Sequence, residues 1–240
     1  MVGIRVSCLM LSGPFFSNRA IPILSKVGLL AVLTGLLYPI VAPPPLPENL
    51  GEWLAVAGHE TAVGLMIGLT LNFVFEGVQL AGQIVGFQFG FSLANVIDPQ
   101  TQVDTPVLSV FHQLVALLIF LRLDVHHWLL RGLGKSFEYL PAGSALSSMT
   151  VDVLFRMAGG LWVIGIQIAA PVLLATFAAD VALGFLAKAS PQFPILFLAI
   201  PAKSLLGYSV LLGAVAFWPG ILQRHFLDAL SFVEQLLKLA

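Results

Sequence analysis

Six stretches of at least 15 residues carry no Asp, Glu, Lys or Arg, and they limit what this chain can fold into more than any other feature. They cover residues 27–47, 61–75, 77–97, 105–121, 157–179 and 204–223. A helix that spans a membrane needs about 20 apolar residues, because the hydrocarbon core of a bilayer is about 30 Å thick. The pattern therefore predicts an all-α integral membrane protein.

The overall composition excludes other classes of protein. Charged residues make up 10% of the chain, against about 25% in soluble globular domains, and the mean hydropathy is +0.98. Intrinsic disorder requires low hydrophobicity and high charge, so it is excluded as well. The net charge of −1 offers no basic surface for nucleic acid. The one cysteine, Cys8, allows neither an internal disulfide nor a thiolate metal cluster.

The predicted helices are irregular. Only residues 77–97, 157–179 and 204–223 are expected to span a bilayer comfortably. Residues 61–75 and 105–121 are shorter, and residues 27–47 are interrupted by Pro39, Pro43, Pro44, Pro45 and Pro47. Pro171 and Pro219 fall inside apolar stretches, where proline is expected to kink a helix. With 22 Gly and 15 Pro in the chain, we predict bent and broken helices in one membrane-embedded domain over residues 1–240.

Charges between the apolar stretches suggest a topology. Basic loops are expected on the inner side of a membrane, and the acidic loops here are placed on the outer side. This placement requires residues 61–75 and 77–97 to be two crossings that turn at Glu76-Gly77. Met1 to Leu11 contains Arg5 before an apolar run, but no small-residue cleavage site follows, so we expect no cleaved signal peptide.

One predicted helix carries a stripe of polar and small residues. At 100° per residue, one face holds six of them: Glu76, Gln79, Gln83, Gly86, Gly90 and Ala94. Such a stripe does not suit contact with lipid, and small residues every four positions allow close approach of helix backbones. The stripe is therefore predicted either to pack against another helix of the chain or to line a protein-contact groove or pore.

Three acidic residues near the apolar stretches have two interpretations each. Glu60 and Glu76 flank residues 61–75, and an ionisable group at membrane depth is a candidate proton carrier. They could equally lie at the membrane interface or form ion pairs. Asp98-Pro99 is expected to end the helix, although a proton-relay role for Asp98 stays open.

Sequence motifs for catalysis are missing. Adjacent histidines such as His126-His127 point about 100° apart on a helix and do not suit one metal ion. The segment Gly86-Phe87-Gln88-Phe89-Gly90 has neither the lysine nor the spacing of a phosphate loop. We therefore predict no enzyme activity, no metal and no cofactor.

Ordered fragments along about 220 residues of the chain resemble one family. They include Ser17-Asn18-Arg19-Ala20-Ile21-Pro22, Glu60 with Gly64 and Gly68, Ala81-Gly82 with Gly86-Phe87 and Gly90-Phe91-Ser92, Asp98-Pro99, Phe120 with His126, Ser136-Phe137, Pro141, Ala169-x-Pro171, Gly184, Ala189-x-Pro191-Gln192 and Pro201. In this order they resemble FliR, the flagellar biosynthesis family of the type III secretion export gate.

The resemblance implies a function and a set of partners. FliR-like proteins are structural subunits of a gate that passes unfolded flagellar proteins across the bacterial cytoplasmic membrane at the basal body. They assemble with FliP-like and FliQ-like subunits and work with FlhA-like and FlhB-like export proteins. The family motif falls here on Arg19, Pro22, Glu60, Gly82, Phe87, Asp98, Pro99, Pro191 and Gln192.

Two other hypotheses remain at the level of sequence. The same pattern occurs more loosely in gate subunits of virulence-type secretion systems, and the Arg19-to-Pro22 turn favours the flagellar branch. An independent proton-coupled transporter would use Glu60, Glu76 and Asp98, but it predicts an internal inverted repeat, and none is visible in the sequence.

Overall fold

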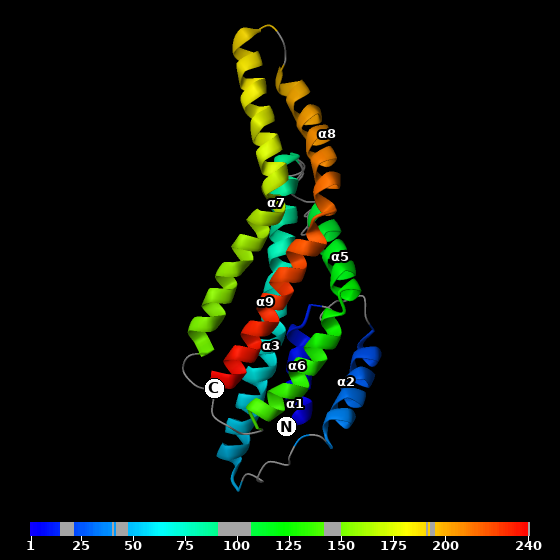
Figure 1. The fold of residues 1–240 in the computed structure, drawn as a ribbon, viewed down its shortest axis with the longest axis vertical. Helices are drawn as coiled ribbons and strands as arrows, with labels where there is room; N and C mark the ends of the chain where they lie inside the picture. Colours follow the sequence, from blue (N-terminus) through cyan, green and yellow to red (C-terminus); the bar gives the residue numbers. More distant parts are fainter. Residues whose placement is uncertain are drawn as a thin grey trace. The chain divides into compact units, whose positions relative to one another are not determined.

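Every regular element in the described part of the chain is a helix (Figure 1). The computed structural model describes residues 1–14, 22–39, 41, 48–90, 107–141, 150–190, 192 and 195–239. The helices are α1 (Val2–Ser12), α2 (Ile23–Leu37), α3 (Leu50–Gln88), α5 (Val107–Arg122), α6 (Val125–Tyr139), α7 (Thr150–Ala189), α8 (Ile195–Val215) and α9 (Trp218–Leu239). The predicted all-α class is confirmed.

The helices match a membrane protein with broken spans. Among the described residues, α3 and the segment Ala158–Ala189 of α7 are each long and apolar enough to cross a bilayer. The pairs α5–α6 and α8–α9 are each long and apolar enough to cross a bilayer when their two helices are taken together, and each pair is bent by more than 40° at a short break. The bent and broken helices expected from the glycine and proline content are therefore present.

The predicted turn at Glu76-Gly77 is wrong, because α3 continues through it as one helix of 39 residues. Gly77 does not reverse the chain. A Cβ built on it would lie 2.9 Å from the carbonyl oxygen of Leu161 and from the Cβ of Ile164, both on α7. The glycine thus serves a close helix contact, and α3 ends at Gln88 rather than at the expected residue 97.

The predicted span 204–223 is also divided. Helix α8 ends at Val215 and α9 begins at Trp218. Pro219 therefore lies in the first turn of α9, where its missing N–H is not needed for an intrahelical hydrogen bond. Instead of the expected kink inside one helix, the chain has a break between α8 and α9, just before the turn that contains Pro219.

The chain divides into two compact units. That residues 1–240 form one membrane-embedded domain stays a prediction. Unit 1 comprises Met1–Phe75, Phe120–Gly160 and Arg224–Ala240. Its core includes the rings of Phe75, Phe120 and Phe226, whose centroids lie 5.6–5.7 Å apart. Edge-to-face and tilted contacts at this distance are favourable for aromatic rings.

Unit 2 comprises Glu76–Ile119 and Leu161–Gln223. Within it α7 and α8 run alongside each other (Figure 1), and Lys203 Nζ of α8 lies 2.8 Å from Asp180 Oδ2 of α7. The rings of His112 and Trp218 are buried in this unit, and their centroids lie 4.7 Å apart.

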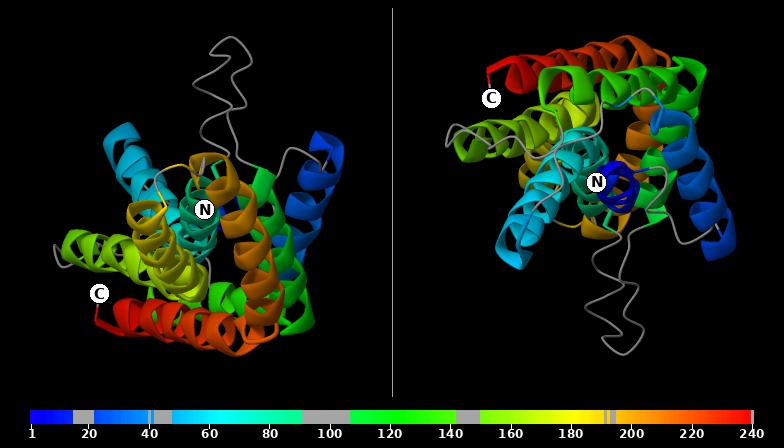
Figure 2. Two further views of the ribbon diagram at one scale, coloured as in Figure 1. Left: turned by 90° about the horizontal axis from the view of Figure 1, so that it is seen from above. Right: turned by 90° about the horizontal axis from the view of Figure 1, so that it is seen from below.

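Glycines on α3 bring α1 close to it in unit 1, where the two helices lie side by side (Figure 2). A Cβ added at Gly64 would overlap the carbonyl oxygen of Arg5 and lie 2.9 Å from the Cβ of Cys8. A Cβ added at Gly68 would lie 2.9 Å from the carbonyl oxygen of Leu9. Both contacts require the absence of a side chain.

We predict that Gly64→Ala destabilises the fold by about 1–3 kcal/mol, because the methyl group forces α1 away from α3. The matched control is Gly58→Ala on the same helix, where none of the described residues comes within 4 Å of an added Cβ. That control should be neutral or slightly stabilising, since alanine favours helix over glycine. Thermal unfolding of both variants in detergent is the measurement, and equal transition temperatures would contradict the close contact.

Candidate functional site

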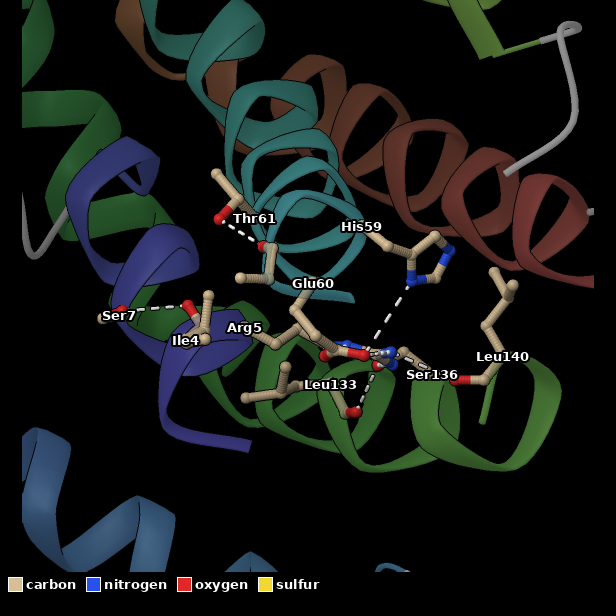
Figure 3. Close-up of polar contacts among 10 residues, drawn as sticks. Ile4, Arg5, Ser7, His59, Glu60, Thr61, Leu133, Ser136 and Leu140 are labelled. Carbon is tan, nitrogen blue, oxygen red and sulfur yellow. Dashed lines mark hydrogen bonds and ion pairs between the residues drawn. The ribbon is translucent and has the colours of Figure 1, made fainter. Parts of the chain in front are cut away.

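The described residues contain one polar cluster that is buried deep in unit 1, centred on Arg5 of α1 (Figure 3). Arg5 Nε donates to Glu60 Oε2 at 2.7 Å, and Arg5 Nη2 donates to Glu60 Oε1 at 2.9 Å. Both side chains are fully buried. This is a two-pronged guanidinium–carboxylate pair, the geometry in which arginine binds a carboxylate best.

The same guanidinium also binds the end of α6. Arg5 Nη1 donates to Ser136 Oγ at 3.0 Å, and Arg5 Nη2 donates to the carbonyl oxygen of Leu140 at 3.1 Å. The carboxyl end of a helix carries partial negative charge, so a cation is stabilising there. Arg5 Cζ also lies 4.0 Å from the centre of the Phe137 ring, a favourable cation–π contact.

The cluster therefore fastens three helices together: α1 through Arg5, α3 through Glu60 and α6 through Ser136, Phe137 and Leu140. A buried charge without partners costs several kcal/mol, and removing one member of a buried pair is strongly destabilising. His59 lies beside the cluster, with Nδ1 3.9 Å from Glu60 Oε1. Because its hydrogen bonds join three helices of unit 1, the arrangement fits a structural role.

The predicted polar stripe on α3 is divided among different surroundings. Gln79 is half-buried, and its Oε1 accepts a hydrogen bond of 2.7 Å from Gln113 Nε2 of α5. Glu76 is half-buried, Gln83 is exposed and Gly86 is buried. Gly90 follows the end of the helix with a φ of 81°, a conformation that favours glycine. Ala94 lies outside the described residues.

The other family-motif positions also occupy separate places. Gly82 faces α5, where an added Cβ would lie 2.5 Å from the Cα of Ser109. Pro22 directly precedes α2, while Phe87 is 71% exposed on α3. Gln192 is exposed in a turn. Four positions lie outside the described residues: Arg19, Asp98, Pro99 and Pro191.

Sequence reasoning identified Glu60 but missed its partners. Arg5 was interpreted only as the charge that precedes an apolar run, and Ser136 only as part of a family motif. The missed signal was a lone arginine inside an apolar helix, since a charge at such a position needs an opposite charge nearby. The partner could not be located, because Glu60 is 55 residues away in the sequence.

Comparison with known proteins identifies a family. Residues 1–229 match the model of the bacterial export proteins, family 1. The flagellar biosynthetic protein FliR of Bacillus subtilis (strain 168) is 32% identical over 88% of this chain and 83% of that protein. The FliR protein of Escherichia coli (strain K12) is 31% identical over 87% of this chain and 80% of that protein. That of Caulobacter vibrioides is 27% identical over 88% and 85%.

We predict that Arg5→Met and Glu60→Leu each destabilise the protein by about 3–5 kcal/mol, because each leaves the other charge buried and unpaired. The double variant should recover most of that loss, since both charges are then replaced by apolar side chains. A double-mutant cycle of unfolding free energies in detergent measures the coupling. Additive effects of the two substitutions would contradict a paired role.

Proposed function

Because the chain belongs to the bacterial export proteins, family 1, and within them to the FliR family, we propose that it works by packing with other subunits rather than by catalysis. As a FliR-type protein it is a membrane-embedded subunit of the flagellar type III protein export gate. In the proposed role, its helices help to form the channel through which unfolded flagellar proteins cross the membrane.

The observation that carries this proposal is the unburied apolar surface of α2. No residue of this helix is buried, and Ile23 and Leu24 are 76% and 82% exposed. Its 15 residues give about 22 Å, less than the thickness of the hydrocarbon core. Neither the described part of the chain nor a bilayer alone covers the apolar surface of α2, so we infer that a neighbouring subunit covers it.

Helices α7 and α8 of unit 2 support the same conclusion. Large apolar side chains on them are exposed, among them Trp162, Phe177, Phe185, Leu205 and Leu212 at 59–73%. Large apolar side chains exposed in this number are expected to contact lipid or protein. The proposed neighbours are FliP-like and FliQ-like gate subunits, with FlhA-like and FlhB-like export proteins acting beside them.

The proposed location is the bacterial inner membrane at the flagellar basal body. Long apolar helices place the chain in a membrane, and its relatives are named as flagellar biosynthetic proteins. These names favour the flagellar system over a virulence-type one. A proton-coupled transporter is disfavoured, because the Glu60 carboxylate is held by Arg5 rather than open to a transported ion.

The stripe on α3 stays a proposal for helix packing or channel lining. The described residues of the stripe fit both roles. Gly86 is buried, as helix packing requires, whereas Gln83 is exposed, as a channel lining requires. Gln79 is already bonded to α5, so it contributes to packing within unit 2.

Co-expression tests the proposed function directly. The chain should purify as a stable complex with FliP-like and FliQ-like proteins and should restore motility to a strain that lacks its FliR. A monodisperse chain that moves a small solute without these partners would contradict the gate role.

We predict that Gly86→Val abolishes recovery of the complex, because Gly86 is buried and a branched side chain prevents close approach of its neighbours. Gly58→Val on the same helix is the matched control, since none of the described residues lies within 4 Å of an added Cβ there. Yield of the co-purified complex is measured. A normal yield for Gly86→Val would exclude close packing at that position.

We predict that Glu76→Gln leaves flagellar export unchanged, because a half-buried side chain in a packing stripe needs size and polarity rather than a proton. Secretion of flagellar subunits into the medium is the measurement. Loss of export with a normal amount of complex would instead assign proton coupling to this carboxylate.

A further inference from the structure

A pocket in unit 1 lies between the two amphipathic helices of the described chain, α6 and α9. Its volume is about 380 Å³. Both helices follow a bend, and each is the second half of a broken apolar pair. Amphipathic helices that carry basic residues on their polar face commonly lie in the interface between lipid and water.

Part of the pocket lining is apolar. Ile67 of α3 and Leu129 of α6 are 2% exposed, and Val233 of α9 is 6% exposed. Leu227 and Leu230 of α9 continue this surface toward the outside. The dimensions and chemistry of this surface suit a hydrocarbon chain.

Another part of the lining is basic. Arg131 and Lys135 are exposed one turn apart on α6 and both line the pocket. Among the described residues, neither has a hydrogen bond or an ion pair to another side chain. Trp128, which is 37% exposed, lines the same side, and tryptophan is enriched where membrane meets water.

The acidic residue of the pocket does not neutralise this side. Glu234 of α9 accepts a hydrogen bond of 3.4 Å from the Tyr139 hydroxyl group. Two cations and one carboxylate among the lining residues leave a formal charge of +1. Two adjacent donors beside an apolar surface match a phosphate group that is attached to an acyl chain.

We propose that this pocket binds an anionic phospholipid, with its phosphate on Arg131 and Lys135 and an acyl chain against Leu227 and Leu230. Basic pockets between membrane helices recognise acidic head groups by this combination of charge and apolar contact. The bound lipid would hold α6 and α9 together from outside, in addition to the contacts inside unit 1.

Lipid-dependent thermal stability of the full chain in detergent tests the proposal. Added phosphatidylglycerol should raise the unfolding temperature, because a ligand that binds only the folded state stabilises it. Phosphatidylethanolamine should raise it less, and inorganic phosphate should have no effect. Equal stabilisation by phosphatidylethanolamine, or stabilisation by phosphate alone, would overturn the proposed ligand.

The double variant R131Q/K135Q should bind phosphatidylglycerol on the order of thirtyfold more weakly, since each basic residue near a membrane surface adds roughly fivefold to anionic lipid binding. The matched control is R122Q/K188Q, which removes the same charge at exposed positions outside the pocket. Native mass spectrometry counts the bound lipid in each. Unchanged lipid binding in R131Q/K135Q, or an equal loss of lipid in R122Q/K188Q, would overturn the proposal.

Discussion

The buried pair of Arg5 and Glu60 is the interaction on which unit 1 depends. The two prongs of this pair, at 2.7 and 2.9 Å, fix α1 to α3 in one register. Two further donors of the guanidinium bind Ser136 and Leu140 at the end of α6. An apolar helix can slide or rotate on another apolar helix at little cost, whereas a buried charge must meet its partners. The pair therefore supplies the specificity that packing alone does not.

Glycine contacts act together with this pair. Gly64 lies one turn after Glu60, and it allows the backbone of α1 to approach at Arg5 itself. Such an approach brings the guanidinium within reach of Glu60. On the same helix, Gly77 and Gly82 serve α7 and α5 within unit 2. The small residues of α3 thus mediate contacts with different helices, and they do not form a single uniform face.

The sequence was informative about the class of fold and about irregular helices, because composition and proline act locally. It failed at Glu76-Gly77, where a turn was inferred from the charges of distant connections although no proline or turn motif stands there. It also missed Arg5, whose meaning depends on Glu60 in another helix. The stripe on α3 was expected to share one environment. Side chains such as Gln79 and Gln83 differ because helices from other parts of the chain cover only some of that face.

The central claim is that one buried ion pair makes α1, α3 and α6 a single cooperative unit. Hydrogen–deuterium exchange of the backbone, compared between the unmodified chain and Glu60→Gln, tests it most directly. The account predicts that Glu60→Gln accelerates exchange in α1, in the first half of α3 and in α6 together, because the three helices lose a common anchor. Faster exchange confined to α1, with α3 and α6 unchanged, would contradict it.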